Sequence, residues 1–135
     1  RQRQMCIRDR GMPVVVAEGV VGRVVRSSPR FARVLLVTDA SSAVASLLQG
    51  NRARGICRGK GERLVFDFVL RQEEVKVGDR VVTSGMGGVF PKGLVVGEVT
   101  SVDRQKFGLF QAVEVVPAVD FSHLEEVLVL LRRPQ

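Results

Sequence analysis

The chain has 135 residues, enough for one ordinary domain or two small ones. Apolar residues make up 45% of it, which excludes wholesale disorder, and its formal net charge is +7. The longest uninterrupted apolar run near the C-terminus, 127–131, is far shorter than the roughly 20 residues of a membrane-spanning helix, so we expect a soluble chain with its own core.

The first ten residues, RQRQMCIRDR, differ in composition from the rest. They hold four arginines and one aspartate, follow neither helix nor strand periodicity, and lack the apolar segment of a signal peptide. The string resembles translated sequencing-adapter sequence, so we expect residues 1–10 to be a foreign or disordered leader. Without them the net charge falls from +7 to +4, which is mildly basic and no signature of nucleic-acid binding.

From Gly11 onward, runs rich in valine and leucine alternate with turn residues at spacings of about ten residues. This pattern favours an all-β fold, either a small barrel or a sandwich. Strands are predicted at 20–27, 32–38, 53–58, 64–70, 80–84, 94–104, 111–116 and 126–131. The apolar residues of 64–70 alternate with a period of two, which predicts a core face formed by Leu64, Phe66, Phe68 and Leu70.

Three local features qualify this pattern. The small residues of 41–49 suit either a helical turn or an edge strand. Asp120 is predicted to cap one short helical turn that leads into the last strand. Cys57 lies alone on a predicted strand, where a small buried side chain is the simplest interpretation.

The glycine-rich stretch VTSGMGGVFPKGLVVGEV, residues 82–99, invites comparison with phosphate-binding loops. A P-loop needs lysine after its second glycine and a helix behind it, but here Lys92 precedes Gly93 and a strand follows. The dinucleotide fingerprint has Phe90 where its third glycine belongs. The residues are therefore predicted to build tight turns, with a bulge or a close backbone approach at the last glycine, and no cofactor is expected. This turn motif comprises Gly85, Gly87, Gly88, Pro91, Gly93 and Gly97.

No catalytic or metal site is predicted. The single histidine, His123, lies beside Ser122 in the predicted helical turn, and the nucleophile elbow is absent around Ser84. A metal site would have to combine His123 with Asp120 or Glu125, which is a weak ligand set. There is no Trp or Tyr to stack on single-stranded nucleic acid.

Four segments carry a resemblance to a known family. They are GMPVVVAEGVVGRVV, RVLLVTDASSAV, VKVGDRVVTSGMGGVFPKGLVVGEVTSV and EVVPAVDFSHLEEVLVL, and in this order they resemble the extracytoplasmic β-domains of the MreC family of bacterial rod shape-determining proteins. The resemblance covers Gly11 to about Leu131, and VGDRVVTSGMGGVFPKGLVVG is its most specific part. The chain departs from the family pattern at ASLLQGNRARG, so the resemblance does not decide whether a strand forms near Leu47.

The resemblance implies two small β-barrels, one inserted in the other, one of them similar to the barrels of chymotrypsin-like proteases without their catalytic residues. We expect a fairly complete six-stranded barrel in 28–99, a remnant of the first barrel formed by 11–27 with 100–131, and a tail at 132–135. The family also has an N-terminal transmembrane helix, a coiled coil and opening strands. The chain is therefore expected to be a C-terminal fragment whose membrane anchor is absent.

The function implied by the resemblance is that of a non-enzymatic scaffold on the outer face of the cytoplasmic membrane, which helps maintain rod cell shape. The implied partners are the elongation-specific penicillin-binding protein, other shape-determining membrane proteins and further copies of the same protein. The residues expected to contact a partner are Phe90, Phe107, Leu109 and Phe110, of which Phe107 is preferred. The arginine-rich composition leaves one alternative, a small basic barrel that binds RNA or a ribosomal surface, which a steep salt dependence would reveal.

Overall fold

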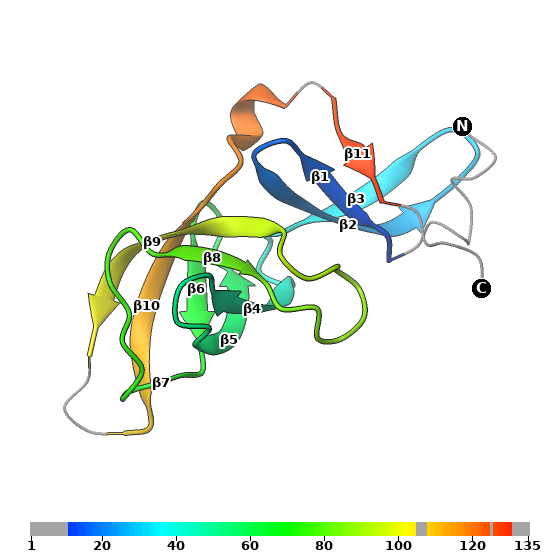
Figure 1. Ribbon diagram of the computed structural model, residues 1–135. Coiled ribbons are helices and arrows are strands. Elements are labelled where there is room, and N and C mark those ends of the chain that lie inside the picture. The colour runs from blue at the N-terminus through cyan, green and yellow to red at the C-terminus, as the bar shows by residue number, and fades with distance from the viewer. Residues whose placement is uncertain (1–10, 105–107, 125, 131–135) are drawn as a thin grey trace.

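The computed structural model describes residues 11–104, 108–124 and 126–130, and all of their regular structure is β except for one 3₁₀ turn, Phe121–His123 (Figure 1). The predicted all-β fold is therefore confirmed. The strands form two sheets, a seven-stranded one and a four-stranded one. The predicted tail and leader lie outside the described residues.

The seven-stranded sheet closes on itself as a barrel. Its strand order is β6-β5-β4-β8-β9-β10-β7, and an additional pairing of β6 with β10 closes the ring of six strands, with β7 extending β6 along β10. Closure of this kind removes the unpaired backbone edges of an open sheet. The strands are β4 (Ala43–Leu48), β5 (Arg54–Gly59), β6 (Leu64–Asp67), β7 (Val69–Leu70), β8 (Arg80–Thr83), β9 (Val95–Asp103) and β10 (Phe110–Pro117).

The barrel interior is filled by aliphatic side chains together with the rings of Phe66 and Phe90. Phe66, Leu64 and Leu48 are almost fully buried there, and Cys57 is buried beside them. Burial raises the pKa of the Cys57 thiol to about 12, so the thiol stays protonated at neutral pH. The interpretation of Cys57 as a small buried side chain is consistent with this environment.

The four-stranded sheet, called the small sheet below, has open ends. Its order is β11-β1-β2-β3, so β11 and β3 are its outer strands. Its strands are β1 (Pro13–Val16), β2 (Gly19–Ser27), β3 (Ala32–Leu36) and β11 (Leu128–Val129). Met12, Val14, Val21, Val24 and Val119 form its buried core.

The two sheets meet where β2 begins. Val20 belongs to the barrel core, and a Cβ added to Gly19 would lie 2.5 Å from the carbonyl oxygen of Val95 in β9. The backbones of β2 and β9 thus approach too closely for any side chain larger than hydrogen. This contact holds the small sheet against one end of the barrel (Figure 1).

The strand pairings differ from the predicted division into 28–99 and its flanks. The boundary at 28 falls inside the β2–β3 hairpin, because Ser27 pairs with Ala32 and β3 therefore stays with the small sheet. The boundary at 99 falls inside β9, and β10 closes the barrel instead of joining the small sheet. Strands that follow one another in the chain usually pair, and this rule places β3 beside β2 and β10 beside β9.

One local prediction was left open, and another was wrong in part. The segment 41–49 contains β4, which is not an edge strand, since it pairs with β5 on one side and β8 on the other. The predicted core face of 64–70 holds only for Leu64 and Phe66: Phe68 and Leu70 are 54% and 40% exposed, whereas Val69 is fully buried. The strand is interrupted at Phe68, whose φ of 67° reverses the alternation of the side chains that follow.

Candidate partner-binding surface

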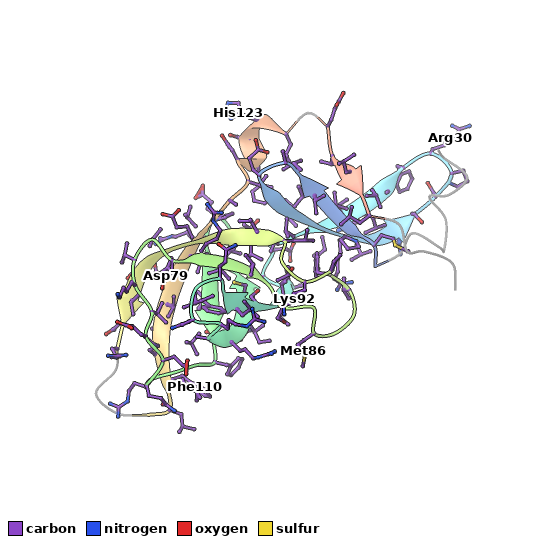
Figure 2. All side chains as sticks on the ribbon, in the orientation of Figure 1. Arg30, Asp79, Met86, Lys92, Phe110 and His123 are labelled. Carbon is purple, nitrogen blue, oxygen red and sulfur yellow. The ribbon has the colours of Figure 1, made fainter. Side chains whose placement is uncertain are left out.

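Four large apolar side chains are exposed together where β7 meets the start of β10. Leu109 is 70% exposed, Phe68 54%, and Leu70 and Phe110 40% each. Phe110 is the cross-strand partner of Leu70, and its ring packs edge-to-face on Phe68 with centroids 5.5 Å apart. We call these four residues the aromatic patch, which lies at the end of the barrel marked by Phe110 in Figure 2. Exposed apolar clusters of this kind are typical of protein-binding surfaces.

The backbone of Phe68 explains why the patch faces solvent. A φ of 67° places it in the left-handed region, which costs a bulky residue about 1–3 kcal/mol. The sequence offers no glycine or asparagine at this point to lower that cost. Because of this backbone conformation, the side chain of Val69 lies in the core and the ring of Phe68 faces outward beside Phe110. Such strain is concentrated at functional sites, so it singles out this corner of the barrel.

Side-chain hydrogen bonds from one buried and one exposed residue hold the patch in place. The side-chain amide of Gln111, which is 4% exposed, donates to the carbonyl oxygens of Leu70 at 2.9 Å and Glu73 at 2.8 Å. From the other side, the guanidinium of Arg104 donates to the carbonyl oxygens of Arg71 and Glu73, both at 3.1 Å. The segment that follows β7 is therefore fixed to β10 and to the end of β9. A rigid surface loses little conformational entropy when a partner binds.

The four predicted contact residues have different environments. Leu109 and Phe110 belong to the aromatic patch, and Phe107 lies outside the described residues. Phe90 is only 8% exposed and packs in the barrel core, so it does not belong to the aromatic patch. Phe68 and Leu70 were predicted to face the core, because the alternation of 64–70 continues through both residues and nothing in the sequence marks the interruption at Phe68.

The glycine-rich segment is a loop between two strands. β8 leads into it and β9 leaves it, without the helix that a phosphate loop requires. The backbone amides of Gly93 and Leu94 donate to the backbone and side-chain oxygens of Thr83, both at 2.9 Å, so the loop supplies its own acceptors. Gly85, Gly87, Gly88 and Gly93 have φ between 76° and 95°, in the left-handed region that favours glycine. A Cβ at Gly97 would lie 2.2 Å from the carbonyl oxygen of Val116.

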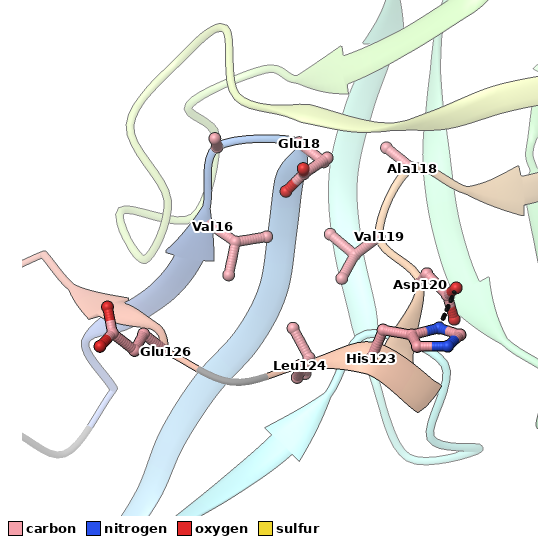
Figure 3. A pocket seen from close by; sticks show the side chains of 9 residues that line it. Val16, Glu18, Ala118, Val119, Asp120, His123, Leu124 and Glu126 are labelled. Atoms are coloured by element: carbon pink, nitrogen blue, oxygen red, sulfur yellow. Dashed lines mark hydrogen bonds and ion pairs between the residues drawn. The ribbon is translucent and has the colours of Figure 1, made fainter.

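Asp120 caps the 3₁₀ turn that contains Ser122 and His123. Asp120 and His123 line a groove of about 430 Å³ (Figure 3). Asp120 Oδ2 lies 2.6 Å from His123 Nδ1, while Ser122 Oγ donates to Asp120 Oδ1 at 2.6 Å and lies 3.1 Å from the same Nδ1. A catalytic triad needs the serine and the carboxylate on opposite ring nitrogens. Here the serine and the carboxylate both contact Nδ1, so the group is no triad, and Asp120 serves as the N-cap of the turn. Hydrogen bonds from Ser122 and His123 hold the pKa of Asp120 below its usual value.

Two further observations concern ligands and membranes. Within 11–104, 108–124 and 126–130, no three His, Cys, Asp or Glu side chains are grouped as a metal site would require, and Glu125 lies outside these ranges. None of the helical structure in the same ranges has the length and apolar character needed to cross a bilayer.

Sequence comparisons point to one family. Residues 8–131 match the family model described as rod shape-determining protein MreC, barrel core. The cell shape-determining protein MreC of Haemophilus influenzae is 35% identical over 122 residues, which cover 89% of this chain and 35% of the relative. That of Bacillus subtilis is 37% identical over 103 residues, which cover 70% of this chain and 36% of the relative. The chain thus spans about a third of the length of these relatives.

Solved structures agree with this similarity. MreC from Pseudomonas aeruginosa has a TM-score of 0.87 at 35% identity, covering 90% of this chain and 80% of that chain. A chain in the complex between Penicillin-Binding Protein (PBP2) and MreC from Helicobacter pylori has a TM-score of 0.65 at 25% identity, covering 76% of this chain and 64% of that chain. On the strength of the family match and of its barrel and small sheet, the chain belongs to the MreC family of rod shape-determining proteins.

Proposed function

We propose that this chain is part of a non-enzymatic scaffold of cell-wall elongation, which maintains rod cell shape by binding a cell-wall synthase. Membership of a shape-determining family supports the process, and the Helicobacter pylori complex with Penicillin-Binding Protein (PBP2) supports the class of partner. Other shape-determining membrane proteins and further copies of the same protein complete the proposed set of partners. The proposed location is the outer face of the cytoplasmic membrane.

The observation that carries the proposal is the aromatic patch on a closed barrel. Phe68 and Phe110 supply two rings that are already paired and half exposed, and Leu70 and Leu109 widen the apolar area around them. Interface hot spots are typically aromatic anchors of this kind. The bracing by Gln111 keeps them in one arrangement before the partner arrives.

A double substitution tests the patch. Phe68→Ala combined with Phe110→Ala removes both rings, and we expect the binding free energy for the extracytoplasmic region of the elongation synthase to weaken by about 2 kcal/mol, or about 30-fold in Kd. Both residues are exposed, so the melting temperature should change little. The measurements are a fluorescence titration and a thermal melt on the same samples.

Phe31→Ala is the matched control, because Phe31 is 61% exposed but lies in the β2–β3 loop of the small sheet. It should leave the affinity unchanged. Equal weakening by the control and the double variant would show that the assay reports general hydrophobic contact. Unchanged binding by the double variant would move the interface away from the patch, and a parallel loss of stability would assign the rings to the fold.

A further inference from the structure

The outer face of the β2–β3 hairpin carries three arginines. Arg26 pairs directly with Arg33 across the strands, and Arg23 pairs with Leu35. Residues 33 and 35 of β3 point to the same face because side chains alternate along a strand, so the three arginines share that face. The opposite face carries Val24 and Val34, which pack on the core of the small sheet. Arg26 and Arg33 are exposed, and Arg23 is half-buried toward the barrel.

These charges are not balanced locally. Residues 19–38 contain four arginines and no acidic residue, the fourth being Arg30 at the hairpin tip (Figure 2). Among the described residues no ion pair involves Arg23, Arg26, Arg30 or Arg33. Like charges directly opposite each other destabilise a β-ladder, so the Arg26–Arg33 pair costs stability in the free chain. An anionic partner would remove that cost.

An apolar cavity adjoins this basic face. Arg23 lines a cavity of about 220 Å³ together with Ala45 and Ile56 of the barrel and Met86 and Phe90 of the glycine-rich loop. Ala45 and Ile56 are cross-strand partners on β4 and β5, so the floor of the cavity is the outer surface of the barrel. The cavity is therefore a slot between the two sheets, with apolar walls and Arg23 in its lining.

The spacing of these features matches an extended peptide. Arg23 and Arg26 lie on the same face of β2, because a β-bulge between Val24 and Arg26 takes up the extra residue. The distance between them along the strand is therefore that of about two strand residues, or about 7 Å. Alternate side chains of an extended chain have the same spacing. A segment whose apolar side chain enters the slot would thus place acidic side chains near Arg26 and Arg33, which bind carboxylates through paired hydrogen bonds.

We propose that the slot and the basic hairpin face together bind an extended acidic segment of a partner protein, with one apolar side chain in the slot and carboxylates on Arg23, Arg26 and Arg33. This surface is separate from the aromatic patch and does not depend on the synthase proposal. The concave slot favours a protein segment over a membrane or a polyanion, because a flat lipid surface cannot enter it and a polyphosphate has no apolar group to fill it.

The probe is a fluorescein-labelled peptide of alternating glutamate and leucine, with blocked termini, titrated into the 135-residue chain. One control peptide has lysine for every glutamate, and another has serine for every leucine. We expect saturable binding of the first peptide and a loss of at least about tenfold in affinity for each control, because both the charge and the apolar group are used. Equal binding of the serine peptide would overturn the role of the slot.

Two variants locate the site. Arg26→Gln with Arg33→Gln should weaken peptide binding by at least about tenfold, whereas Lys60→Gln with Arg80→Gln, which removes the same charge elsewhere on the surface, should change it by less than about twofold. Ala45→Leu fills the slot without altering charge and should weaken binding comparably to the arginine variant. Melting temperatures confirm that each variant is folded.

The remaining outcomes contradict the proposal. Equal weakening by the two charge variants would mean unspecific attraction to a basic chain. Binding to vesicles of phosphatidylglycerol that is lost in the Arg26, Arg33 variant, with no binding of the peptide, would assign the face to a lipid surface. Absence of peptide binding by a folded parent at low salt would overturn the proposal outright, while leaving the synthase proposal untouched.

Discussion

The barrel and the small sheet have similar valine-rich strands, but only the barrel closes. Pairing of β6 with β10 completes the barrel, whereas β3 and β11 each have one neighbour in the small sheet. In the described chain sixteen buried residues form the barrel core and five form that of the small sheet. The closed barrel therefore has the larger buried core, although the strands of both regions are rich in valine.

The comparison indicates how each region is used. The barrel is rigid enough to hold Phe68 in a strained conformation and to present the aromatic patch without rearrangement. Among the described residues, the small sheet instead leaves one edge of β3 and one edge of β11 without a neighbouring strand and carries a basic face without ion pairs. We therefore expect the barrel to dominate stability and the small sheet to respond most to its surroundings.

Removal of the central ring should test the dominance of the barrel most strongly. Phe66 is fully buried, and Phe66→Ala leaves a cavity that should lower the free energy of unfolding by about 3–5 kcal/mol in urea titrations. Phe31→Ala is the control and should change it by less than about 0.5 kcal/mol, since Phe31 is exposed. A small effect of Phe66→Ala would mean that the barrel does not dominate.

Overpacking at the β9–β10 contact should have the next largest effect. In Gly97→Ala the new methyl group meets the carbonyl oxygen of Val116, and we expect a loss of about 1–3 kcal/mol by chemical denaturation. Gly50→Ala has open space around it and should leave stability the same or raise it by about 0.4–1 kcal/mol. Equal behaviour of the two alanines would contradict the close approach of β9 and β10 at Gly97.

Alkaline pH should loosen the barrel through Cys57. The folded pKa is raised to about 12 from 9.0, so the unfolded thiol ionises first and stability falls as the pH rises between these values. The expected slope is up to about 1.4 kcal/mol per pH unit relative to Cys57→Ala, in a background where Cys6 is serine. Parallel pH profiles of parent and variant would show that the thiol is not shielded by the closed barrel.

The smallest effect on stability is expected at Phe68. Phe68→Gly removes the left-handed strain but also the ring contact with Phe110, and these opposing terms should leave the net change within about 1 kcal/mol. Synthase binding should nevertheless fall, because one anchor of the patch is gone. A large loss of stability, measured by thermal melting, would make Phe68 a structural residue.

The sequence predicts what depends on local pattern and misses what depends on closure. Valine alternation and turn glycines predict most of the strands, although β1 was not predicted and β4 was left open. The N-cap at Asp120 is found because it needs only neighbouring residues. The pairing of β6 with β10 joins residues about fifty positions apart, so no local pattern reveals it. The outward turn of Phe68 depends on its positive φ, and its contact with Phe110 depends on the similarly distant pairing of β7 with β10, so the aromatic patch was predicted only in part.

The central claim is that the barrel, through the aromatic patch, makes the contact with the synthase. Hydrogen exchange of the chain with and without the extracytoplasmic region of the synthase tests it most directly. We predict new protection at the amides of 68–71 and 109–112, with none in 19–36. Protection confined to the small sheet, with exchange at 68–71 and 109–112 unchanged, would contradict the claim.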